Sequence, residues 1–134
     1  MTSIVDIEGV GEQYAEKLKA IGVASVEALL EKGATSKGRT EIADKSGIGA
    51  KHILRWVNHA DLFRIKGVAG QYSELLEASG VDTVVELSKR KPENLYEAMV
   101  KSNTEKRLVR ALPSQDKVSD WVAQAKALPR KVQY

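Results

Sequence analysis

The feature that most constrains the fold is an internal repeat of 23 residues. The segment from Ile7 to Leu29 recurs without a gap from Ile65 to Leu87, at an offset of 65 − 7 = 58 residues. Twelve aligned positions are identical, whereas composition alone would give roughly one or two. We therefore predict that the chain is an internal duplication of one structural unit.

Composition limits the class of protein. The chain has 134 residues, of which 43% are hydrophobic and 29% charged, and it has no cysteine. This balance is typical of a globular protein. The lack of cysteine excludes disulfides and thiolate metal sites and favours a reducing compartment, so a cytoplasmic location is expected. We expect no signal peptide. No apolar run approaches the ~18–20 residues needed to cross a bilayer, so no membrane partner is expected.

The charge pattern repeats along the chain. The net charge of +3 is too small to indicate nucleic-acid binding by itself. Residues 1–31 and 63–88 are net acidic, whereas residues 32–62 and 89–134 are net basic. Solvated helix faces would give this pattern, and so would a basic surface for an acidic partner. Both interpretations remain open at this point.

Helical spacing of apolar residues predicts short helices and no strands. Thr83 with Glu86, and Ser102 with Glu105, match the capping-box pattern at a helix start. We expect an all-α protein of two units, residues 1–62 and 63–134, with both tryptophans, Trp56 and Trp121, in the core. The expected helices are 12–21, 26–32, 39–45, 50–60, 71–79, a short helix after Thr83, 93–101, 104–112 and 114–128.

Each repeat opens with a glycine turn that leads into a helix. In Gly9-Val10-Gly11 the two glycines allow a tight turn and close approach to another molecule, and the apolar residue between them points to the core. The helix that follows presents free N–H groups, which favour an anion. This arrangement resembles the helix-hairpin-helix motif of DNA repair and recombination proteins. The resemblance implies that hairpin amides contact backbone phosphates without reading the base sequence.

Longer stretches carry two further resemblances. Residues 4–62 are similar to the small helical amino-terminal domain of RecA-type recombinases, through IEGVGEQYAEKLKAIGVASVEALL and IADKSGIGAKHILRWVNHA. Over its whole length the chain is similar to a bacterial family known as domain of unknown function 4332. The stretches that carry this likeness are VNHADLFRIKGV, RKPENLYEAMV and WVAQAKALPRKV. The family name conveys no activity, so this resemblance supports the fold more than the function.

The glycine turns differ as candidate phosphate sites. Glu8 and Glu12 flank the first turn and would repel a phosphate, so that turn is expected to be structural. The third turn, Gly67-Val68-Ala69-Gly70, departs from the pattern because Ala69 stands where a second glycine is expected. Its flanking residues Arg64 and Lys66 are basic and would favour a phosphate. The predicted structural hairpin residues are Gly9, Val10, Gly11, Gly67 and Val68.

The second turn, Gly47-Ile48-Gly49, lies between the two repeated segments and is the preferred phosphate site. It has two glycines, no acidic flank, and Lys51 beside the expected helix start. We expect Lys51 and Arg55 to be exposed and to contact the same DNA strand. The predicted nucleic-acid-binding residues are Gly47, Ile48, Gly49, Ala50, Lys51, His52, Arg55, Arg64 and Lys66.

Catalysis is not expected. His52 and His59 lie seven residues apart on one helix, about 10 Å, which is too far to share a metal without other ligands. Gly9-Val10-Gly11 lacks the strand and the third glycine of a dinucleotide-binding fingerprint. We predict no metal, no cofactor and no small-molecule substrate. The favoured function is weak, sequence-independent DNA binding; the alternative is a protein–protein interaction module with the same fold.

Overall fold

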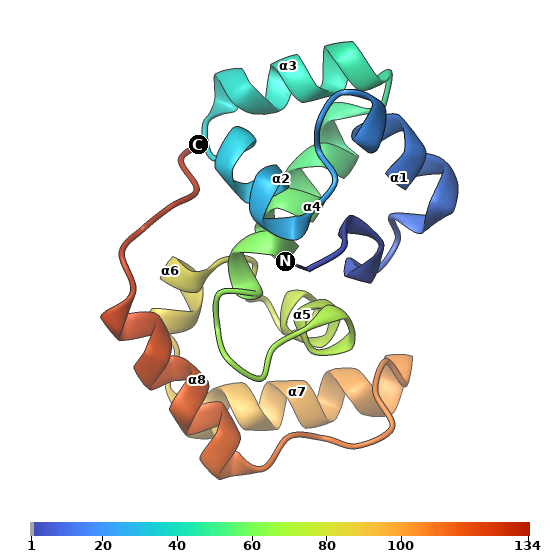
Figure 1. Ribbon diagram of the computed structural model, residues 1–134. Coiled ribbons are helices and arrows are strands. Elements are labelled where there is room, and N and C mark those ends of the chain that lie inside the picture. Colours follow the sequence, from blue (N-terminus) through green and yellow to red (C-terminus); the bar gives the residue numbers. More distant parts are fainter. Residues whose placement is uncertain (1) are drawn as a thin grey trace. The chain divides into compact units, whose positions relative to one another are not determined.

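The computed structural model describes residues 2–134, and these residues form an all-helical protein with no strand (Figure 1). A single isolated bridge pairs Ser3 with Ser25. The elements of the described chain are η1 (Ile4–Asp6), α1 (Gly11–Ala20), α2 (Val26–Lys32), α3 (Ser36–Ser46), α4 (Ala50–Leu62), α5 (Gly70–Ala78), α6 (Val84–Ser88), α7 (Pro92–Lys106) and α8 (Gln115–Ala127). The predicted fold class is therefore confirmed.

The chain divides into two compact units. Unit 1 runs to Asp61 and also includes Lys131–Tyr134, and unit 2 is Leu62–Arg130. The boundary lies beside the one expected from the sequence, but the last four residues group with unit 1. They do so because their backbone is bonded there: Gln133 N donates to Ala34 O at 2.7 Å.

Side-chain caps explain where several helices begin. A serine or threonine oxygen accepts a backbone N–H three residues later, which satisfies one of the amides left free at a helix start. These bonds join Ser25 to Ala28 (3.0 Å), Thr35 to Gly38 (3.0 Å), Thr83 to Glu86 (3.3 Å) and Ser114 to Lys117 (3.2 Å). Glycines with φ of +85° and +92°, Gly22 and Gly80, follow α1 and α5.

Two predicted helix assignments are wrong. The helix α3 begins at Ser36, three residues before the expected start at Arg39, because Thr35 caps it. A single helix, α7, runs through Ser102 to Lys106, and residues 107–114 form a loop, so there is no helix 104–112. The Ser102 hydroxyl donates to Ala78 O at 3.2 Å and does not cap a new helix. The Asn103 side chain bonds both N and O of Val109, at 2.9 and 3.1 Å, and so holds the loop against the end of α7.

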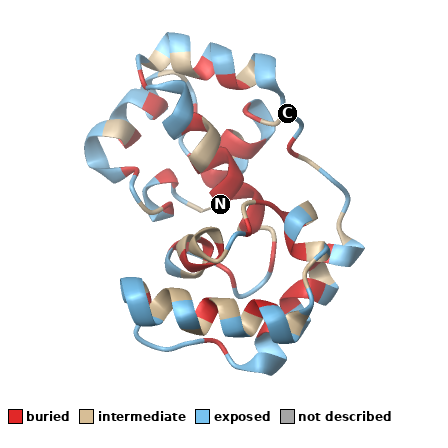
Figure 2. Ribbon diagram, turned by 180° about the vertical axis from the view of Figure 1, so that it is seen from behind, coloured by how far each residue is buried: buried red, intermediate tan, exposed pale blue. Residues whose placement is uncertain are grey.

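Each unit has an apolar core that contains one tryptophan, as predicted. Trp56 is 1% exposed and Trp121 is 2% exposed. Buried and exposed positions alternate along α7 and α8, as expected for helices with one inward face (Figure 2). The core of unit 2 gathers buried residues from α5 to α8, among them Leu75, Leu95 and Val118.

None of the helices in residues 2–134 is both long enough and apolar enough to span a bilayer.

Candidate nucleic-acid interface

The second glycine turn joins α3 to α4 (Figure 1). Gly47 has φ +72°, a left-handed conformation that favours glycine, and its N–H donates to Ala43 O at 2.9 Å. Ile48 is buried, whereas Gly47 and Gly49 are exposed. The turn therefore inserts its apolar residue into unit 1 and leaves the backbone of both glycines open to solvent.

The residue before α4 is a glycine, so α4 has no side-chain cap of the kind found at α2, α3, α6 and α8. The helices α1, α5 and α7 also begin without a side-chain cap. Gly49 precedes the helix, and its carbonyl accepts from His52 N at 3.0 Å and Ile53 N at 3.3 Å. Glycine has no side chain with which to cap the first amides, which lie at Ala50 and Lys51. Because uncapped amides and the helix dipole both favour negative charge, this end of α4 can accept an anion.

The side chains around this turn are only partly as predicted. Ala50, Lys51 and His52 are exposed. The His52 ring, however, packs against two aromatic rings, with centroids 5.7 Å from Tyr14 and 5.5 Å from Trp56. His52 therefore extends an aromatic cluster of unit 1, and only its open side is available to a ligand.

Arg55 differs from the prediction. It is half-buried rather than exposed. Its Nη1 atom lies 3.9 Å from the position that a Cβ on Gly9 would occupy. The guanidinium thus lies beside the first glycine turn. That it contacts the same DNA strand as Lys51 remains a prediction.

The first turn packs over Trp56. Gly9 has φ +92° and Gly11 has φ +63°, and Val10 between them is buried. A Cβ at Gly9 would lie 3.7 Å from Trp56 Nε1, which is an ordinary contact. A Cβ at Gly9 would therefore have room, and the backbone conformation is what favours glycine at this position. Glu12 in the first turn of α1 is exposed.

The third turn lies over the second tryptophan. Gly67 has φ +97°, and a Cβ there would lie only 3.0 Å from Trp121 Nε1. Val68 is buried, as predicted for a structural hairpin. Ala69 adopts φ −135°, whereas Gly11 of the first turn has φ +63°. Alanine rarely adopts positive φ, so the third turn enters its helix by a different backbone path.

The two basic residues before the third turn make hydrogen bonds within unit 2, Lys66 through its backbone and Arg64 through its side chain. The Gln124 side chain accepts from Lys66 N at 2.8 Å and donates to Lys66 O at 3.2 Å, which leaves only the exposed Lys66 side chain free of these bonds. Arg64 is half-buried and donates from Nη2 to Pro129 O at 2.6 Å. Both residues lie in unit 2, whereas the second turn lies in unit 1.

The corresponding region of unit 2 has no glycine turn. Arg107 takes the left-handed conformation after α7, with φ +51°, and Ser114 caps α8. An uncapped helix start like that of α4 is therefore missing there.

Sequence reasoning did not identify Lys45, which is exposed in the last turn of α3, two residues before Gly47. Its position just before a glycine turn could have identified it.

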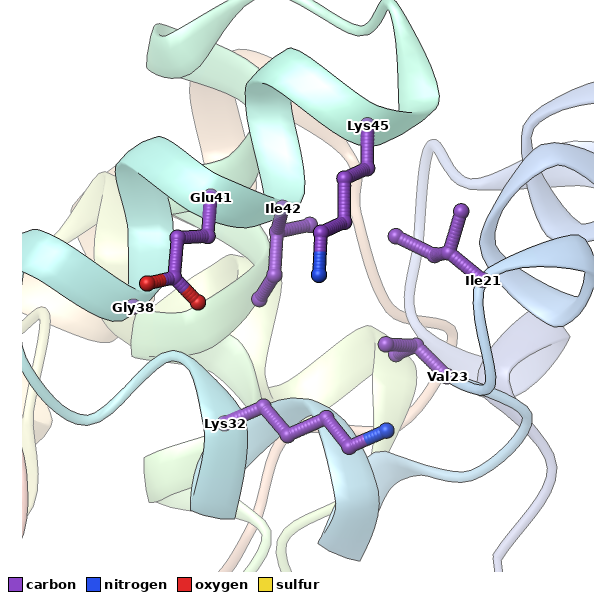
Figure 3. Close-up of a pocket in the computed structure, with 7 residues that line it drawn as sticks. All are labelled: Ile21, Val23, Lys32, Gly38, Glu41, Ile42 and Lys45. Carbon is purple, nitrogen blue, oxygen red and sulfur yellow. The ribbon is translucent and has the colours of Figure 1, made fainter.

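Unit 1 also has a pocket of about 340 Å³, which none of the predicted binding residues lines (Figure 3). Three of its lining residues are aliphatic. The ammonium groups of Lys32 and Lys45 extend into the space that they line, and Lys32 Nζ donates to Gly22 O at 3.1 Å. The lining residues are Ile21, Val23, Lys32, Gly38, Glu41, Ile42 and Lys45.

The residues in the described part of the chain form no cluster of three or more His, Asp or Glu side chains that could hold a metal ion.

Together the observations define an all-helical protein of two units, each with a glycine turn packed on a tryptophan. The chain belongs to the family described as Domain of unknown function (DUF4332), whose model matches residues 8–128. No curated protein and no solved structure matches the chain.

Proposed function

We propose that this protein is a non-catalytic module that binds the DNA backbone without reading its sequence. The observation that carries the proposal is the exposed turn Gly47-Ile48-Gly49 at the uncapped start of α4, next to Lys51. Backbone amides at a helix start bind phosphate, and phosphate contacts carry no direct sequence information. The proposed contacts are the amides of Ala50 and Lys51 and the Lys51 ammonium.

The proposal includes helix-hairpin-helix units related by duplication. Paired features inside the two units support it. Tyr14 lies 5.1 Å from Trp56, and Tyr72 lies 5.4 Å from Trp121, measured between ring centroids. In both units the indole Nε1 lies beneath a glycine with positive φ.

The alternative is a protein-interaction module. Such a surface usually has a contiguous apolar patch. Within residues 2–134 the exposed large hydrophobic side chains are Val5, Leu112 and Tyr134. They come from well-separated parts of the sequence, and single exposed hydrophobic residues are normal on a protein surface. This scarcity favours DNA over a partner with an apolar interface.

A titration at two salt concentrations tests the proposal. Fluorescence anisotropy with two duplexes of unrelated sequence should give similar Kd values of ~10⁻⁴–10⁻⁶ M, with binding much weaker at the higher salt. Lys51→Glu should weaken binding and reduce the salt slope by about one unit, because one phosphate contact is lost.

Lys89→Glu is the matched control, because it makes the same charge change at an exposed position in unit 2. An equal loss in both variants would mean that binding follows net charge and not the second turn. A parent protein that binds neither duplex at low salt would overturn the DNA proposal in favour of a protein partner.

Gly49→Ala tests the contribution of the backbone. A Cβ there would meet only His52 Cδ2, at 3.7 Å, so the variant should fold like the parent. The added methyl group would stand where a phosphate must approach the amides of α4, so DNA affinity should fall severalfold. Anisotropy gives the affinity and circular dichroism the melting temperature. Unchanged affinity in a normally folded variant would show that these amides do not contact DNA.

A further inference from the structure

The 131–134 segment binds to unit 1 as an extended peptide would. Gln133 N donates to Ala34 O at 2.7 Å, and Gln133 O accepts from Arg39 Nη2 at 2.8 Å. Both backbone polar groups of this residue are thus paired, as in a strand added to a sheet edge. In Figure 1 this end of the chain lies at the start of α3, beside α2.

Arg39 is positioned for this role by unit 1 itself. It lies in the first part of α3 and is only 8% exposed. Its Nη1 atom donates to Gly33 O at 2.9 Å and to Ala34 O at 3.2 Å, which are carbonyls at the end of α2. Because the planar guanidinium is held by these bonds, its Nη2 donor has a fixed direction toward the peptide.

Three side chains of the segment make different contacts. Lys131 Nζ lies 2.8 Å from Glu31 Oε2, Val132 is buried, and the Tyr134 hydroxyl donates to Asn58 Oδ1 at 3.0 Å. The Tyr134 ring also lies against the Arg39 guanidinium, 5.7 Å from its Cζ. Unit 1 therefore recognises three features of the segment in order along the chain: a positive charge, an aliphatic side chain and a phenol.

Two observations indicate that the segment can be exchanged. Tyr134 is 65% exposed although its hydroxyl is bonded, and the Glu31 and Lys131 side chains are 73% and 40% exposed. The hydrogen bond and charge of Lys131 lower the pKa of Glu31 from its usual 4.5. The ion pair is therefore formed at neutral pH and is lost only as the pH falls through this lowered pKa. Exposed ion pairs of this kind contribute little to stability.

We propose that this face of unit 1 is a docking site for an extended peptide of the pattern Lys-aliphatic-any-Tyr. Residues 131–134 are its resident occupant, and a segment with the same pattern on another protein chain competes for it. This function is separate from DNA binding, because Glu31, Ala34, Arg39 and Asn58 are not among the residues of the second turn.

The test uses the full chain and a fluorescein-labelled peptide of residues 128–134. In a tail-released variant, Lys131→Glu with Val132→Asp, the chain's own segment should leave the site. The peptide should bind this variant at least ~tenfold more tightly than the parent, because a linked segment competes at an effective concentration on the order of millimolar. A peptide of scrambled sequence should not bind.

A charge swap at Glu31 provides a control. The Glu31 side chain is largely exposed, so a change in peptide binding on its substitution would not result from unfolding. In the tail-released background, Glu31→Lys should weaken binding of the lysine peptide by about fivefold. A peptide with glutamate in place of lysine should recover that loss. The proposal is overturned if the folded tail-released variant binds no peptide, if the scrambled peptide binds equally, or if the swap gives no recovery.

Discussion

Replacing Trp56 or Trp121 by alanine should lower the free energy of unfolding of its own unit by ~3–5 kcal/mol. Both indoles are almost completely buried, and each supports a glycine turn and a neighbouring tyrosine ring. Truncation removes the largest side chain of the core and leaves a cavity that the short surrounding helices can fill only in part. A loss of this size is a large part of the stability of a small unit.

The two tryptophans are the only ones in the chain, and each unit has one. In Trp56→Ala the remaining fluorescence therefore reports on unit 2, while circular dichroism reports on both units. Urea titrations should show the dichroism change starting at lower urea than in the parent. Phenylalanine at either position should cost less, because the aromatic body is kept. If Trp56→Ala and Trp121→Ala both unfold at the urea concentration of the parent, the indoles do not support the cores.

Local sequence signals were sufficient to predict much of the fold. Apolar spacing and capping residues predicted α2 at its observed bounds, and a last helix from Ser114, within one residue of the observed start of α8. These features depend on residues close together in sequence, which is why they can be recognised without a structure. The repeat also predicted that Gly9 and Gly67 begin turns, and both have positive φ.

Features that depend on distant contacts were not predictable. The end of α7 depends on Asn103, whose side chain bonds Val109, and no local signal distinguishes this from a helix that stops at Lys101. The docking of Gln133 on Arg39 joins residues 94 positions apart. The position of Arg55 beside Gly9 likewise depends on how α4 packs against the first turn. In the last two cases the partner lies outside any window in which periodicity can be recognised.

The candidate site was predicted better in its backbone than in its side chains. Gly47, Ile48 and Gly49 form an exposed turn with a buried apolar residue, and this follows from two glycines around an isoleucine before a helix. The roles of His52 and Arg55 depend on the rings and turns that pack around them. Helical spacing alone could place them on α4 but could not show that His52 packs on Trp56.

Alanine at Gly67 should destabilise the protein more than alanine at Gly9. Both glycines have φ near +95°, at +97° and +92°, and a left-handed backbone costs an L-residue about 1–2 kcal/mol. At Gly9 no further cost is expected, because the new Cβ would make an ordinary contact with Trp56 Nε1, at 3.7 Å. At Gly67 the Cβ would be 3.0 Å from Trp121 Nε1, so the indole must shift, which adds about 1–3 kcal/mol.

Urea denaturation of four variants and their combinations separates these two costs. Trp121→Phe removes Nε1, so it should relieve the crowding in Gly67→Ala, and the double variant should be more stable than the sum of the single changes predicts. Trp56→Phe should give no such relief to Gly9→Ala, because no close contact exists there. Equal costs at the two glycines, or additive changes in both pairs, would mean that the backbone conformation alone requires glycine. A coupling confined to the Gly67 pair would show that the third turn selects glycine through the indole beneath it, whereas the first turn selects it through φ.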